Sequence, residues 1–109
     1  MQHWDLTAHA VEPHRPEVLD STGEGRAILL ALPAGESLQE HQVHERAWVL
    51  VVSGTIRLTA GDQHIEGGPG LLAAFEPHER HEVRAQSDAR LLLLLAPWPG
   101  EGRPPDWRS

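Results

Sequence analysis

Hydrophobic residues along the chain come in short groups of three to seven positions, and residues that favour turns separate the groups. Glycine, proline and acidic residues supply the breaks, and no segment repeats its apolar residues at the period of a helix. This pattern predicts an all-β domain of seven or eight short strands. The predicted strands cover 27–32, a weaker 37–43, 47–52, 55–59, 71–75, 81–83 and 90–96.

Alternation distinguishes two kinds of predicted strand. Ile56 and Leu58 alternate with polar residues, so one face of this strand is expected to be exposed to solvent and the other buried. In segments 47–52 and 90–96 apolar and polar residues do not alternate, so both faces of these strands are apolar and must be buried against a second sheet or another subunit. Five consecutive leucines in 90–96 would promote aggregation at a free edge. The sequence therefore predicts a sandwich, jelly roll or small barrel that forms a homodimer through an edge strand.

Three aromatic or large apolar residues have predicted places in this fold. Phe75 and Leu72 are expected in the core. Trp48 shares a strand face with Leu50 and Val52, opposite Ala47, so it faces outward if Ala47 faces inward. An outward Trp48 would pack on a sheet face or a subunit contact, and an inward one would line a pocket.

The chain divides into three predicted parts. Residues 1–25 form an N-terminal arm with an edge strand, for which Trp4 and Leu6 are candidate anchors. Residues 26–96 form the β-barrel. The tail, 97–109, is rich in proline and glycine and is not expected to form regular structure. Its two tryptophans are expected to hold it on the body of the protein, unless the tail becomes ordered on a partner chain.

Composition narrows the classes of function. A chain of 109 residues is one domain. Its net charge is −7 with no cluster of lysine or arginine, which argues against nucleic acid and anionic membranes as partners. The absence of cysteine excludes disulfides, thiol catalysis and zinc–thiolate sites. The first residues lack the basic start and apolar core of a signal peptide, so we expect a soluble cytoplasmic protein.

Two segments carry a family resemblance. Residues 35–54, GESLQEHQVHERAWVLVVSG, resemble the first motif of the cupin superfamily, which has a glycine, five residues, a His-x-His pair, a glutamate and a closing glycine. Residues 68–83, GPGLLAAFEPHERHEV, resemble the second motif, which has glycines, a proline and a histidine before the next strand. The resemblance implies a small jelly-roll barrel over 26–96. Many cupins hold one divalent metal by three histidines and a glutamate at the barrel mouth.

The motif positions transfer to this chain only in part. His41 and His81 stand at the first and last histidine positions. Val43 takes the place of the second histidine, and Ala47 or Trp48 takes that of the glutamate. His44, with Glu45 after it, lies one residue beyond Val43.

The resulting hypothesis is an open site formed by His41, His44 and His81, with a fourth position for water or substrate. Imidazole ligands suit several divalent ions, and Zn, Ni, Fe, Cu and Mn all stay open. Because imidazoles must be neutral to coordinate, metal affinity is expected to fall as the pH drops through about 6. Glu45 and His78 are further candidates for the site.

Other interpretations of the same residues stay open. A loop histidine beside a glutamate is often a hydrogen-bonded surface pair. Arg46 and Arg80 could meet an anionic ligand or simply be solvated, and Glu36, Glu40 and Glu45 are not expected to be buried as a glycosidase pair requires. Three functions therefore remain: a metal-dependent enzyme acting on a small molecule, a metal-free binding or sensing domain, and a structural dimer module with a vestigial pocket.

Overall fold

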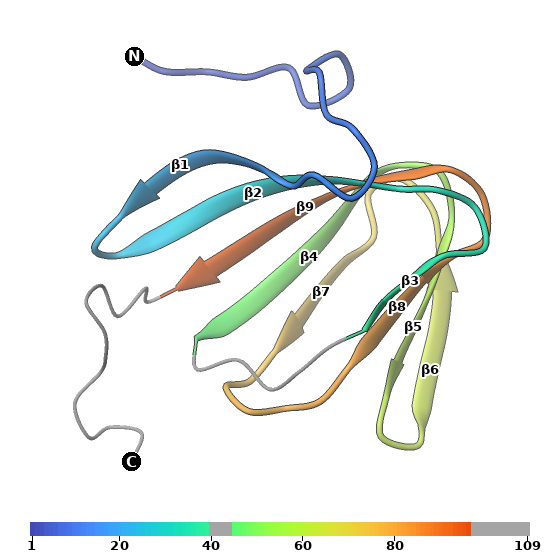
Figure 1. Cartoon of the computed structure of the whole chain (residues 1–109). Coiled ribbons are helices and arrows are strands. Elements are labelled where there is room, and N and C mark those ends of the chain that lie inside the picture. Colours follow the sequence, from blue (N-terminus) through green and yellow to red (C-terminus); the bar gives the residue numbers. More distant parts are fainter. Residues whose placement is uncertain (40–44, 97–109) are drawn as a thin grey trace.

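The computed structural model describes residues 1–39 and 45–96, and in these the chain is all-β (Figure 1). One sheet has the strand order β1-β2-β9-β4-β7 and the other the order β3-β8-β5-β6, with every neighbouring pair antiparallel. The strands are β1 (Glu17–Thr22), β2 (Gly25–Leu32), β3 (Ser37–Gln39), β4 (Arg46–Ser53), β5 (Ile56–Ala60), β6 (Gln63–Gly67), β7 (Leu72–Phe75), β8 (Glu82–Ala85) and β9 (Ala89–Ala96). These residues form no helix that is long and apolar enough to span a membrane.

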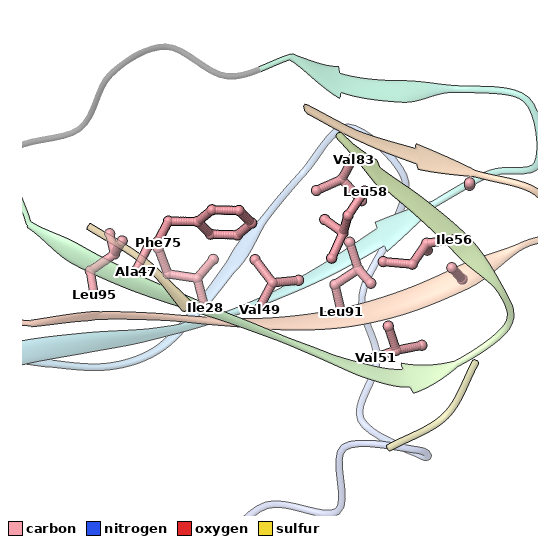
Figure 2. Close-up of a cluster of buried hydrophobic side chains, with 12 residues drawn as sticks. Ile28, Ala47, Val49, Val51, Ile56, Leu58, Phe75, Val83, Leu91 and Leu95 are labelled. Carbon is pink, nitrogen blue, oxygen red and sulfur yellow. The ribbon is translucent and has the colours of Figure 1, made fainter. Parts of the chain in front are cut away.

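The core lies between the facing sides of the two sheets (Figure 2). Every second residue of β4 is buried, and the same period recurs along β9 and β5 because successive side chains of a strand point to opposite faces. The buried residues of this cluster are Ile28, Ala47, Val49, Val51, Ile56, Leu58, Phe75, Val83, Ala85, Ala89, Leu91 and Leu95. The predicted two-sheet barrel is therefore confirmed.

Of the nine strands in the described residues, seven coincide with predicted ranges, although the predicted 37–43 is described only as far as residue 39. β1 lies in the N-terminal arm, for which an edge strand without exact bounds was expected. The apolar pattern had not indicated β6, which reads Gln-His-Ile-Glu-Gly and has four exposed residues. This strand is held as a hairpin on β5, and its own sequence is mostly polar because it lies at the edge of its sheet. Polar edge strands leave no alternation for a sequence pattern to detect.

The N-terminal arm is tied to the first sheet by hydrogen bonds. The Arg90 guanidinium donates to the carbonyl oxygens of Leu6 at 2.8 Å and His9 at 2.7 Å. Within the arm, the hydroxyl and amide of Thr7 donate to the Asp5 carboxylate. These bonds, the hydroxyl one foremost, lower the pKa of the Asp5 carboxyl. An arginine of the last strand thus fixes the path of the first residues.

The outer face of the five-stranded sheet is also apolar. Trp48 lies beside Leu94 and Ala74 in the ladder, on the side opposite Ala47 and Phe75, so its expected outward position is confirmed. The expectation for Leu72 was wrong, because its side chain is 57% exposed. Phe75 and Ala73 use the inner face of β7, and alternation then turns Leu72 outward.

Candidate functional site

One end of the barrel brings the two motif segments together. At this end β4 begins, β7 ends at Phe75, and residues 76–81 lead into β8. Ala47 lies opposite Phe75 in the ladder. The Arg46 guanidinium donates two hydrogen bonds to one oxygen of Glu76, at 2.8 and 3.0 Å. This pair joins the start of β4 to the residue after β7, just beyond the last paired residues of the two strands. The segment that carries His81 is therefore held next to the start of β4.

His81 is half-buried and held in a defined orientation. Its ring stacks on the ring of Phe75 with a centroid distance of 3.8 Å and an angle of 7° between the planes. Its Nδ1 lies 3.2 Å from the backbone oxygen of Glu79. Because a carbonyl can only accept, Nδ1 carries the proton, and the neutral ring then has its lone pair on Nε2. Metal-binding histidines are commonly oriented by such a bond from the second ring nitrogen.

Glu45 is the buried charged residue of the described chain, with 5% of its surface exposed. The burial of Glu45 corrects the expectation for this one residue, whereas Glu36 is not buried and Glu40 lies outside the described residues, so no buried carboxylate pair is shown. Glu45 lies directly before β4 and two positions before Ala47. Because residues two positions apart in a strand point to the same face, Glu45 points to the core side, as Ala47 does. Among residues 1–39 and 45–96, no hydrogen bond or ion pair shown by the structure involves its side chain. The spacing to Ala47 was the sequence signal for this burial.

An apolar residue stands at the position where the cupin motif has its glutamate ligand, and the residue opposite it in the sheet is also apolar. Of the two candidates for that position, Ala47 is the inward one, with 1% of its surface exposed. Phe75 lies across the ladder from it, and Figure 2 shows the two side by side at one end of the core cluster. Neither residue has a donor atom for a metal. Any carboxylate at this mouth must therefore come from another position, and Glu45 is the nearest along β4.

The remaining candidate residues are either outside the described part of the chain or exposed on its surface, apart from Arg46. His41 and His44 fall outside the described residues, as does Glu40. His78 is exposed and has a left-handed backbone with φ of 70°. Arg80 is exposed, whereas Arg46 is bonded to Glu76 and lies 5.8 Å above the Trp48 ring. Within the described part of the chain, no three potential ligands cluster tightly enough to hold an ion by themselves.

The chemistry of the two described donors nevertheless fits a metal centre. His81 supplies an imidazole nitrogen with a defined tautomer, and Glu45, a buried residue, supplies a carboxylate. Nitrogen and oxygen donors of these kinds bind Zn²⁺ and the other divalent ions of the transition series. Residues 40–44 connect β3 to Glu45 along the chain and contain two further imidazoles.

A small cavity opens beside Phe75, between β5–β6 and β7. Its volume is about 140 Å³. The walls are mostly apolar, with Leu58, Ala73 and Phe75 among them, and polar atoms come from residues such as His64 and Glu79. Sites for drug-sized ligands are usually about 300–1,000 Å³, so this cavity suits only a small molecule.

Comparison with known proteins places this geometry in a family. The profile of the Cupin domain matches residues 28–97. An L-ectoine synthase of Nocardia farcinica is 29% identical over 68 residues, which cover 61% of this chain and 52% of that protein. The chain thus spans about half the length of this curated relative.

Solved structures with the same fold include two proteins named as RmlC-like cupins. An RmlC-like cupin of Desulfovibrio desulfuricans superposes with a TM-score of 0.78 at 22% identity, covering 89% of this chain and 97% of that one. A Thermus thermophilus protein gives 0.78 at 24% identity, with coverage of 89% and 98%. A double-stranded β-helix protein of Methanocaldococcus jannaschii gives 0.71 at 19%, with coverage of 79% and 82%. These structures share the fold of this chain, and the match of the Cupin domain to residues 28–97 shows that the chain belongs to the cupin family.

Proposed function

We propose that this protein is a metal-binding cupin that acts on a small molecule, with the ion held by His41, His44 and His81. The observation that carries the proposal is the orientation of His81. Its Nδ1 is hydrogen-bonded to the Glu79 carbonyl and its ring is stacked on Phe75. A solvated surface histidine needs neither restraint, whereas a ligand must present Nε2 in one direction.

Glu45 is the proposed fourth donor. A buried carboxylate is costly unless a cation or hydrogen-bond donors compensate for its lost hydration. Glu45 lies on the inward side at the start of β4, two residues before the alanine that replaces the family glutamate. A bound divalent ion would supply that compensation. When bound, the ion would serve as a Lewis acid or oxygen activator, and the similarity to a protein named L-ectoine synthase supports an enzymatic role.

The alternative function is a metal-free cupin that binds or senses a small molecule. Ala47 and Phe75 favour it, because they make this part of the mouth apolar. The cavity of about 140 Å³ beside Phe75 would then be the ligand site itself. Such a protein should gain thermal stability from a ligand even after treatment with a chelator, whereas a metal-dependent site should respond to the metal.

Metal analysis of protein purified without an affinity tag tests the main proposal. We expect about one ion per chain in the wild type, as for a single three- or four-ligand site. His81→Ala should lose most of the metal because it removes a donor atom. Glu45→Gln should weaken binding about tenfold or more because it removes the negative charge of the carboxylate.

His64→Ala is the matched control for these variants, since His64 is an exposed histidine on β6. It should retain its metal. Equal metal content in His81→Ala and the wild type would contradict the proposal. A wild type without metal that is also not stabilised by added Zn²⁺, Fe²⁺, Ni²⁺, Cu²⁺ or Mn²⁺ would favour the metal-free alternative.

We also propose that the protein is a homodimer joined through the edge strand β1. Apart from Met1, the exposed large hydrophobic residues of the described chain are Val18, Ile65 and Leu72, and each lies on an edge strand. β1 is the longest of these edges, and its Val18 is 51% exposed. An unpaired edge with an exposed apolar side chain is a surface suited to pairing with a second copy.

Sedimentation at a series of concentrations tests the dimer. The wild type is expected to sediment as a dimer, and Val18→Lys should shift the equilibrium towards monomer, because it places charge on the paired edge. Ile65→Lys on β6 is the control and should leave the dimer intact. A monomeric wild type, or a shift by Ile65→Lys alone, would exclude β1 as the interface.

A further inference from the structure

A groove lies on the outer face of the five-stranded sheet, on the side of that sheet opposite the core. Its volume is about 590 Å³. Ala27, Leu94 and Trp48 form one row across β2, β9 and β4 on this face. Leu72 and Ala96 extend the apolar lining, and Asp20 and Glu24 are among its polar residues. This surface is unlike the metal site proposed above, and none of its lining residues belongs to that site.

We propose that the tail, residues 97–109 of the same chain, is the occupant of this groove. The tail follows directly from Ala96, which lines the groove. The tail is thus tethered next to its site, and a tethered segment has a high effective concentration there. The match to the cupin domain ends at residue 97, so nearly the whole tail is additional to the family's barrel.

The length of the tail is sufficient. Trp107 stands eleven positions beyond Ala96. A proline-rich extended segment advances about 3.1 Å per residue, so Trp107 can reach about 34 Å from that point. Leu72 lies on β7, two strands from β9 in the sheet. Neighbouring strands are about 4.8 Å apart, so the groove extends only about 10 Å to that side.

The chemistry of the tail also matches the groove. The tail contains two tryptophans, Trp98 and Trp107, and four prolines. Proline-rich segments lose little conformational entropy on binding, and they characteristically dock on grooves lined by aromatic residues such as Trp48. Its two arginines balance its glutamate and aspartate, so docking adds no net charge beside Asp20 and Glu24. An aromatic ring on the exposed Leu72 would remove apolar surface from water.

An engineered thiol provides a direct test, because the chain has no cysteine of its own. Leu72→Cys would be introduced into the full chain, and its rate of alkylation by a soluble thiol reagent measured. We expect the rate to rise about tenfold or more when Trp98→Ala and Trp107→Ala are added. The reagent reaches the thiol only while the tail is out of the groove, and without its two tryptophans the tail should leave the groove more often. Ile65→Cys, on an exposed edge of the other sheet, is the control and should react at the same rate with either tail.

Each outcome of this experiment decides the proposal, and slow alkylation that the two tail substitutions leave unchanged would overturn it. Protection that the two tail substitutions remove, and that does not change on dilution, supports a tail docked on its own chain. Protection that dilution removes would identify a second copy as the occupant and overturn the proposal. Rapid alkylation of Leu72→Cys in the chain with the native tail would show an open groove and overturn it too. Circular dichroism confirms that every variant is folded, and the metal content is not involved in the result.

Discussion

Gly54→Ala is expected to lower the free energy of unfolding by about 4 kcal/mol or more, or to prevent folding. Gly54 follows β4 and has φ of +81°, a left-handed backbone that alanine adopts only with strain. A Cβ atom there would lie 2.1 Å from the Asp88 backbone oxygen and 2.7 Å from the Ala89 Cα. Both contacts are with backbone atoms that cannot rotate away, so the β4–β5 and β8–β9 turns would have to separate.

Gly61→Ala is the matched control for this substitution. Gly61 also has a left-handed backbone, with φ of +61°, but a Cβ atom there would meet no atom within 4 Å. Its expected cost is therefore the conformational strain alone, about 1–2 kcal/mol. Urea denaturation of both variants measures the difference. If the two variants lose the same stability, the close approach of Asp88 is not what requires glycine at position 54.

Phe75→Ala is expected to destabilise the protein by about 3–5 kcal/mol, the usual cost of removing a buried phenyl ring. Phe75 is 5% exposed and lies between Ala47 and the ring of His81. The substitution leaves a cavity at the barrel mouth and removes the surface on which His81 stacks. We therefore also expect weaker binding of the proposed metal ion, because the imidazole loses one of its two restraints.

Phe75→Leu separates the two effects of this substitution. Leucine refills most of the volume, so its stability loss should be clearly smaller, but it lacks a flat ring for stacking on His81. Ile65→Ala, at a residue 41% exposed, should cost much less than Phe75→Ala. Denaturant unfolding and metal titration are the two measurements. A Phe75→Leu variant with wild-type metal affinity would mean that stacking does not orient His81.

The hydrophobic pattern was sufficient to locate the strands that contribute most of the core. Val49, Val51, Ile56, Leu58 and Leu91 all lie in predicted strands, because a buried strand needs apolar residues at every inward position. The edge strand β6 could not be found in this way. Its residues are held by backbone hydrogen bonds to β5 and need no apolar face.

The residues of the candidate site were predictable only in part. The motif spacing indicated His81, and the structure holds this ring at the barrel mouth. Glu45 was overlooked as a buried group, because a carboxylate beside a polar loop resembles a solvated one until β4 is placed in its sheet. The contact of Phe75 with His81 joins positions on either side of a turn, and no spacing rule predicts the stacking of two rings.

By itself, the sequence determined the fold class, the family and the approximate strand positions, since these depend on local periodicity and motif spacing. Only the tertiary structure decided which face is buried in the strands that do not alternate, such as β4 and β7. It turned Ala47 inward and Leu72 outward, and it buried Glu45. The physical reason is that burial depends on which strands lie opposite one another in space, and a linear pattern contains this information only where one face is clearly polar.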